Sequence, residues 1–174
     1  RVSFSGERLN NNRKTLINFR IEYYHMATEA EIIFQLFLAA IIGGIIGVER
    51  QLNGKPAGMR THSLICIGAT LFTIIALTSS DPSGMPRIAA GILTGIGFIA
   101  AGVIFRSRNH IIGLTTATEI WVLTGIGIAI GLGFYFVTIV SAIVVLIVLI
   151  PMKIVEDKAA EIGARRMAKA KGKK

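Results

Sequence analysis

Glu119 is the residue whose type and position most suggest chemistry. It follows Thr115 and Thr116 in the run GLTTATEIWV, inside a long apolar, glycine-rich stretch. Ionisable groups at membrane depth are costly and usually face the interior of a helix bundle, where they mark cation or proton sites. Glu119 is therefore a candidate cation or proton site, with an arginine as its expected partner. The structural alternative is a capping box, in which Thr116 and Glu119 satisfy the first N–H groups of a helix.

Several other polar residues should gather near Glu119. Glu49 and Arg50 end one apolar run, and Arg60, Thr61 and His62 begin the next. If these runs are membrane helices, both ends meet the same face of the membrane. We therefore expect a functional polar cluster, made of Glu49, Arg50, Arg60, Thr61, Thr115, Thr116 and Glu119. In the alternative interpretation each residue is an ordinary flanking charge, and Glu49 forms a structural bridge with Arg50 or Arg60.

Other kinds of chemistry are not indicated. The three histidines have no metal-ligand spacing, so Glu119 is the only candidate for a metal ligand. The GKPAG run does not match a phosphate-binding loop, and no nucleophile–base pair is apparent. The single cysteine, Cys66, excludes an intrachain disulfide. We expect no enzymatic activity and no cofactor.

The elements that position these residues are membrane helices. Hydrophobic residues make up 52% of the 174-residue chain and charged residues 17%, and the mean hydropathy is +0.63. A span needs about 20 mostly apolar residues. The sequence thus predicts an all-α, polytopic helical membrane bundle with about five transmembrane helices. The expected spans are Glu31–Val48, Ser63–Leu77, Ile88–Phe105, Leu114–Ile130 and Phe134–Met152.

The basic residues indicate an orientation. The net charge is +9, and the lysines and arginines lie in the tails and in alternate connections, including the hinge Arg106–Arg108. Cytoplasmic loops carry such an excess, so we expect the N-terminus outside and the C-terminus inside a plasma (inner) membrane. The charge is explained by orientation and by binding to anionic lipids of the bilayer, and no nucleic-acid partner is expected.

The chain divides into three parts. Residues 1–25 are polar and basic, and we expect a disordered or non-native extension, with Met26 as the natural start. Residues 26–152 form the transmembrane domain. Residues 153–174 carry a net positive charge and are expected to form a basic amphipathic helix on the cytoplasmic surface.

Glycines are abundant within the predicted spans. Glycine is unfavourable in soluble helices, but in a bilayer small residues four apart let helix backbones approach closely. The glycines expected to pack against other helices are Gly43, Gly47, Gly91, Gly95, Gly97, Gly102, Gly127 and Gly131.

Three segments resemble the MgtC/SapB membrane family. They read GGIIGVERQLNGKPAGMRTH, GIGFIAAGVIF and GLTTATEIWVLTGIGIAIGLG. The resemblance covers about residues 32–150 and implies the N-terminal transmembrane domain of the family without the soluble C-terminal domain of longer members. Glu119 stands where the family usually has a small or apolar residue, so it inherits no family role. The positions that match the family's motifs are Glu49, Arg50, Ala57, Gly58, Arg60, Thr61, Gly95, Gly97, Gly102, Gly113, Thr115, Thr116, Ala117 and Trp121.

The resemblance implies a role in magnesium-related homeostasis. Some members look like regulators rather than transporters. We therefore expect a non-enzymatic regulator that binds another integral membrane protein, or a second copy of itself, through glycine-rich helix faces. The alternative is a small oligomeric cation (Mg²⁺) transporter or channel, with Glu119 and the threonines lining a path.

Overall fold

Five apolar helices form most of the structure, a computed structural model that describes residues 29–78, 84–107, 110–153, 155, 158–159 and 162. Within the described residues, all five are long and apolar enough to cross a membrane, which confirms the predicted all-α bundle. The predicted extension 1–25 and most of the tail 153–174 lie outside the described residues. The elements are α2 (Glu29–Leu52), α3 (Met59–Thr78), α4 (Gly84–Ala101), β1 (Phe105–Ser107), β2 (His110–Ile112), α5 (Leu114–Gly131) and α6 (Tyr135–Leu149).

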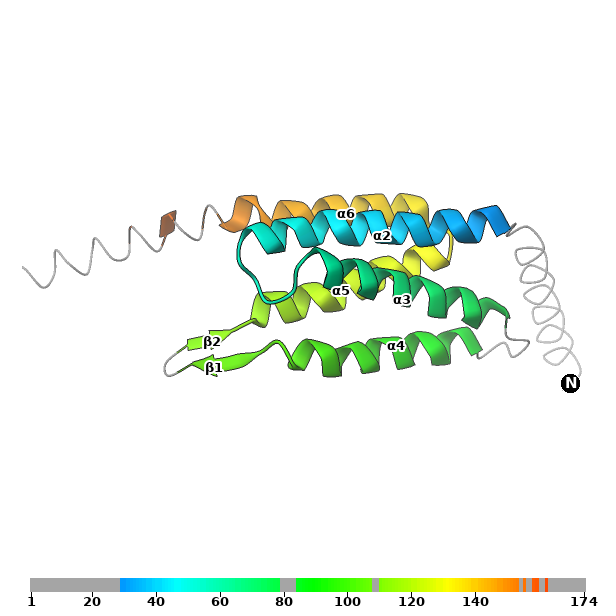
Figure 1. The fold of residues 1–174 in the computed structure, drawn as a ribbon, viewed down its shortest axis with the longest axis horizontal. Coiled ribbons are helices and arrows are strands. Elements are labelled where there is room, and N and C mark those ends of the chain that lie inside the picture. The colour runs from blue at the N-terminus through cyan, green and yellow to red at the C-terminus, as the bar shows by residue number, and fades with distance from the viewer. Residues whose placement is uncertain are drawn as a thin grey trace, which may run out of the picture.

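The helices run roughly side by side (Figure 1). α2 and α6 lie on one side of the bundle, α4 lies on the other, and α3 and α5 lie between them. The α2–α3 connection, the β1–β2 hairpin and the last turn of α6 gather at one end, on the left of Figure 1. We call this the basic end, because it carries Arg50, Lys55, Arg60, Arg106 and Lys153.

The predicted basic hinge is a two-stranded antiparallel hairpin. Phe105 pairs with Ile112 and Arg106 with Ile111. The predicted third span ran to Phe105, but α4 already ends at Ala101. The hairpin closes on Gly113, whose φ is +90° and where an added Cβ would lie only 1.9 Å from the Val103 carbonyl oxygen. A side chain there would be excluded, so glycine permits the close approach that pairs the two strands.

α5 is the central helix. More than half of its residues are buried, whereas α4 and α6 leave most of their surface to the surroundings. Its apolar residues join those of α2, α3 and α6 in the main core, which contains Ala39, Ile42, Ile46, Cys66, Leu123, Ile126, Ile130 and Leu149. A helix that is apolar all round is typical of a buried position or a membrane span.

The predicted packing glycines fall into two groups. Gly43 and Gly47 on α2 lie directly on the backbone of the first turns of α3, and Gly127 and Gly131 on α5 lie on the middle of α3. Any Cβ added at these four would come within 2.6–2.7 Å of an α3 atom. In contrast, Cβ atoms added at Gly91, Gly95 and Gly97 on α4 would meet no described atom within 4 Å. Gly102 lies only near carbonyl oxygens of its own helix end.

Candidate functional site

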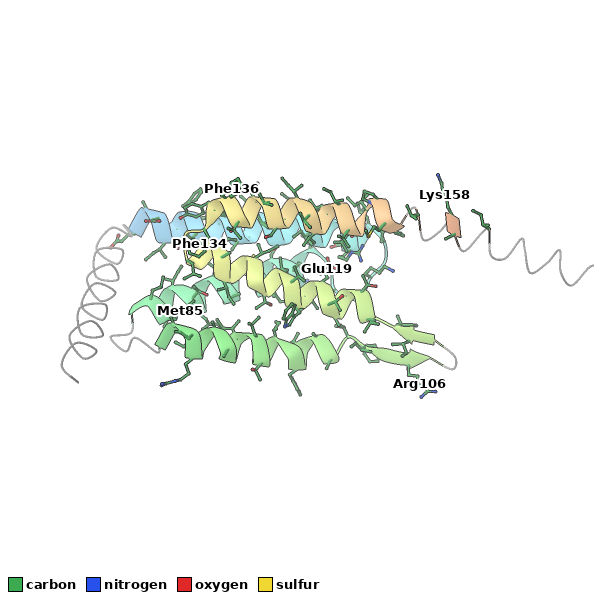
Figure 2. The ribbon with its side chains drawn as sticks, turned by 180° about the vertical axis from the view of Figure 1, so that it is seen from behind. Met85, Arg106, Glu119, Phe134, Phe136 and Lys158 are labelled. Carbon is green, nitrogen blue, oxygen red and sulfur yellow. The ribbon has the colours of Figure 1, made fainter. Side chains whose placement is uncertain are left out.

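A buried charge cluster, formed by Glu49, Arg50, His62 and Glu119, lies where α2, α3 and α5 meet. Glu119 Oε2 is 3.5 Å from Arg50 Nε, and Glu119 Oε1 is 3.3 Å from His62 Nε2. The Arg50 Nε–H donates to Glu49 Oε2. The side chains of Glu119, Arg50 and His62 are only 2%, 3% and 0% exposed, and that of Glu49 is 10% exposed. Figure 2 shows Glu119 on α5, turned into the bundle, whereas Arg106 lies at the hairpin.

Close helix packing brings these residues together. Arg50 is in the last turn of α2, and His62 is in the first turn of α3. Between them, Gly47 removes the side chain that would keep the helices apart, since a Cβ there would lie 2.9 Å from the His62 Cβ. The His62 ring is fixed by its Nδ1, which lies 2.9 Å from the Gly58 carbonyl oxygen.

α5 supplies Glu119 from its second turn. The helix begins at Leu114 with Gly113 as its N-cap and has no side-chain cap. The capping-box interpretation of Thr116 and Glu119 is therefore wrong, because both residues lie inside the helix. Position 119 instead faces α2 and α3, on the same buried side as Ile120 and Leu123.

The arrangement places one guanidinium against two carboxylates. Removing one partner of a buried ion pair leaves an uncompensated charge, which is strongly destabilising. Both Glu119 carboxylate oxygens and His62 Nε2 also lack a well-aligned hydrogen bond among the described residues. Charge attraction rather than hydrogen-bond geometry therefore dominates their contacts. Because both His62 nitrogens face oxygen atoms, the cluster could hold or pass a proton between His62 and Glu119.

The structure separates the residues of the predicted polar cluster. Glu49, Arg50 and Glu119 are in contact, and Thr116 is buried one turn before Glu119. Arg60, Thr61 and Thr115 are instead exposed. Within the described part of the chain, no group of three His, Cys, Asp or Glu side chains could hold a metal ion.

His62 is the member of the cluster that the sequence prediction left out. A signal for it does exist. On α3 the buried residues His62, Cys66, Ala69, Thr73 and Ala76 recur with helical spacing, and the other four are small. A histidine on a face of small residues must point into a closely packed helix contact.

A large groove lies between α3 and α4. We call it the α3–α4 groove; its volume is about 870 Å³ and its walls are almost entirely apolar. The open glycines Gly91 and Gly95 of α4 face Gly68 of α3 across it. Its lining residues are Thr61, Leu64, Ile65, Gly68, Ala69, Phe72, Arg87, Ile88, Gly91, Ile92, Gly95, Ile96, Ile99 and Thr124.

Comparison with known proteins gives one family. Residues 36–158 match the MgtC family, and this range contains the whole charge cluster and the groove. The chain is 48% identical over 128 residues to "Putative magnesium transporter YhiD" of Escherichia coli K12, with 69% of this chain and 60% of that protein covered. It is 41% identical over 114 residues to "Protein MgtC" of Salmonella typhimurium LT2, with 66% and 49% covered.

A third relative is an uncharacterized protein of Haemophilus influenzae, 37% identical over 123 residues, which cover 65% of this chain and 52% of that protein. The chain thus spans about half to three fifths of the length of these relatives. No solved structure matches the chain.

Proposed function

This chain belongs to the MgtC family of membrane proteins, as its three signature segments predicted, and we propose that it is a non-enzymatic regulator in magnesium-related homeostasis. It acts by binding another integral membrane protein, or a second copy of itself, within the bilayer. The multi-pass architecture and the family support a magnesium-related membrane protein. Because the chain covers only part of its relatives, the regulatory activity is proposed for this transmembrane unit alone.

The open glycine face of α4 carries the proposal. Four glycines already pack against α3 within the chain: Gly43, Gly47, Gly127 and Gly131. A Cβ at Gly91 or Gly95, in contrast, would meet no described atom within 4 Å. In a bilayer, helix association depends on close packing at small residues rather than on a hydrophobic driving force. The α3–α4 groove is apolar and lined by glycine on both sides. It therefore fits one apolar helix of a membrane partner.

The orientation follows from the basic end. Lysines and arginines are in excess on the cytoplasmic side of membrane proteins. We therefore place the basic end, with its hairpin and the buried charge cluster, in the cytoplasm of a plasma (inner) membrane. In this orientation its exposed basic residues face the anionic lipids of the inner leaflet.

A matched pair of glycine variants tests the proposal. Gly95→Leu fills the groove, and Gly125→Leu adds the same side chain to α5 outside the groove; neither Cβ would meet a described atom within 4 Å. Tagged protein is purified from membranes of cells grown at low magnesium after cross-linking. We expect a membrane partner to co-purify with the wild type and with Gly125→Leu, but not with Gly95→Leu.

Two further observations decide the outcome. A differently tagged second copy, expressed in the same cells, identifies self-association if it is the molecule that is lost. Equal recovery of every partner with both glycine variants would refute a function of the groove in binding.

The buried charge cluster favours a second candidate, a cation transporter. Glu119 and His62 are buried at the basic end of an apolar bundle and lack well-aligned hydrogen bonds within the described residues. Such groups often mark ion or proton pathways. Magnesium flux into liposomes that contain the purified chain, lost in Glu119→Gln and unchanged in Gly95→Leu, would favour the transporter over the regulator.

A further inference from the structure

A second, polar pocket lies at the basic end, where α2, α5 and α6 meet. Its volume is about 330 Å³. Three cationic side chains from separate segments line it, Arg50 from α2, Lys55 from the α2–α3 connection and Lys153 from the residues after α6. Among the residues that the structure describes, no carboxylate lines it. The remaining lining residues are Thr115, Val148, Leu149 and Met152. We call this the cationic pocket.

Hydrogen bonds of the fold position Lys55 and Lys153, two of the three cations. After α2 the chain turns back through Gly54, whose φ is +63°, and the Lys55 N–H donates to the Arg50 carbonyl oxygen at 3.0 Å. This turn puts Lys55 beside Arg50. On the other side, Lys153 Nζ donates to Asn53 Oδ1, which ties the end of α6 to the same turn.

The first turn of α5 adds a further positive contribution. Its N-cap, Gly113, has no side chain that could accept from the helix. The Ala117 N–H donates to the Gly113 carbonyl oxygen as the first hydrogen bond of the helix. The earlier N–H groups of an α-helix have no partner within the helix, and the helix dipole adds partial positive charge there. Thr115, from this turn, lines the pocket.

The acidic residues nearby do not cancel this charge. Glu49 and Glu119 lie against the Nε of Arg50 in the buried charge cluster. Both contacts are to Arg50, so among the described residues Lys55 and Lys153 keep the lining of the pocket positive. Backbone N–H groups together with lysine and arginine form the usual binding site for a phosphate group.

The wall formed by α6 distinguishes a lipid phosphate from a free phosphate ion. Val148 is 47% exposed and Met152 is 61% exposed, and both continue the apolar outer surface of α6. We propose that the cationic pocket binds the phosphate of an anionic phospholipid, whose acyl chains lie along this surface. A free phosphate would leave the apolar wall without a contact.

The test uses the full chain purified in detergent, with lipid binding measured by native mass spectrometry. The probes are phosphatidylglycerol, phosphatidylcholine and inorganic phosphate. The double variant Lys55→Gln/Lys153→Gln removes two cations from the pocket. The matched control, Arg106→Gln/Lys158→Gln, removes the same charge from the hairpin and from the residues beyond α6, both outside the pocket (Figure 2).

We expect phosphatidylglycerol to bind more tightly than phosphatidylcholine, whose choline cation is repelled by the pocket. The pocket variant should bind phosphatidylglycerol about 30-fold more weakly, from a loss of about fivefold per lysine, and the control should change by less than about twofold. Cys66 is fully buried, so its slow reaction with a maleimide in both variants verifies that they are folded.

Three results would overturn the proposal. Equal weakening in the pocket and control variants would show that general charge rather than this pocket binds the lipid. Equal affinity for the two lipids would show that the pocket does not select an anionic headgroup. Displacement of the lipid by millimolar inorganic phosphate, with no requirement for acyl chains, would assign the pocket to free phosphate instead.

Discussion

Arg50→Gln should destabilise the protein much more than Glu119→Gln, because one guanidinium serves two carboxylates. Arg50 Nε lies 3.5 Å from Glu119 Oε2 and also donates to Glu49 Oε2. Without the guanidinium, both carboxylates remain in a nearly dry site, where, among the described residues, Glu119 has only the His62 contact and Glu49 keeps the hydrogen bond from Asn53 Nδ2. Without the Glu119 charge, the pair between Arg50 and Glu49 survives.

The magnitudes follow from this difference. Breaking a buried ion pair by removing one partner costs about 3–5 kcal/mol, and we expect Arg50→Gln to fall in this range. Glu119→Gln keeps the shape and one acceptor oxygen, which can face Arg50 while the amide NH₂ faces His62. Its cost should resemble that of one altered charged hydrogen bond, about 1.5–3 kcal/mol. The double variant should cost less than the sum of the two, because the Glu119 carboxylate is no longer left unpaired.

Cys66 provides the assay. It is the only cysteine of the chain and is fully buried in the main core, so a maleimide reacts with it only when the bundle opens. When closing is faster than labelling, the labelling rate follows the free energy of opening. At about 1.4 kcal/mol per tenfold change, Arg50→Gln, with its cost of about 3–5 kcal/mol, should accelerate labelling by about two to three and a half orders of magnitude. Glu119→Gln should accelerate it by about one to two orders of magnitude.

The control is Arg60→Gln, which removes a positive charge from an exposed position at the same end. Its effect should stay within about 0.5 kcal/mol, as is usual for a surface substitution. The reasoning would be refuted if Glu119→Gln opened the bundle as readily as Arg50→Gln. It would also be refuted if the two effects were simply additive in the double variant.

Three further substitutions test the packing around the site. Gly127→Leu should lower the melting temperature strongly, because its Cβ would lie 2.7 Å from α3 atoms and overpacking costs about 1–3 kcal/mol or more. Size-exclusion chromatography after heating measures this loss. The control Gly125→Leu should be neutral, because its Cβ would meet no described atom within 4 Å. Gly113→Ala should open the hairpin to protease cleavage, since its φ is +90° and its Cβ would lie 1.9 Å from the Val103 carbonyl oxygen. Thr70→Val should cost about 1 kcal/mol in the Cys66 assay, because it removes the 2.9 Å hydrogen bond from α3 to a carbonyl oxygen of α5.

The sequence predicted the spans well because their signal is local. Length and hydropathy locate a membrane helix without knowledge of its neighbours, and the predicted fourth span, Leu114–Ile130, differs from α5 by one residue. The hairpin was missed for the opposite reason. Its strands are only three residues long, and they form because Gly113 lets the chain return close to Val103. Hydropathy carries no information about that approach.

The partners of the charged residues were only partly predictable. That Glu119 faces an arginine follows from the cost of a buried charge, and the pairing with Arg50 agrees with this expectation. The second contact of Glu119, which is with His62, depends on how α3 is rotated about its axis. That rotation is set by Gly43 and Gly47, which lie on the α3 backbone beside His62. The same sequence pattern leaves Gly91 and Gly95 open, so glycine spacing alone does not tell an internal contact from an external one.

The groove and the charge cluster share the first turns of α3. Thr61 and Ile65 line the α3–α4 groove, while His62 points the other way, into the cluster. α3 packs closely against the glycines of α2 and α5 on one side and lines the α3–α4 groove on the other. Any rotation of its first turns must therefore change the mouth of the groove and the His62–Glu119 contact together. A partner helix in the groove and a proton or cation at Glu119 would therefore contact opposite sides of the same helix, α3.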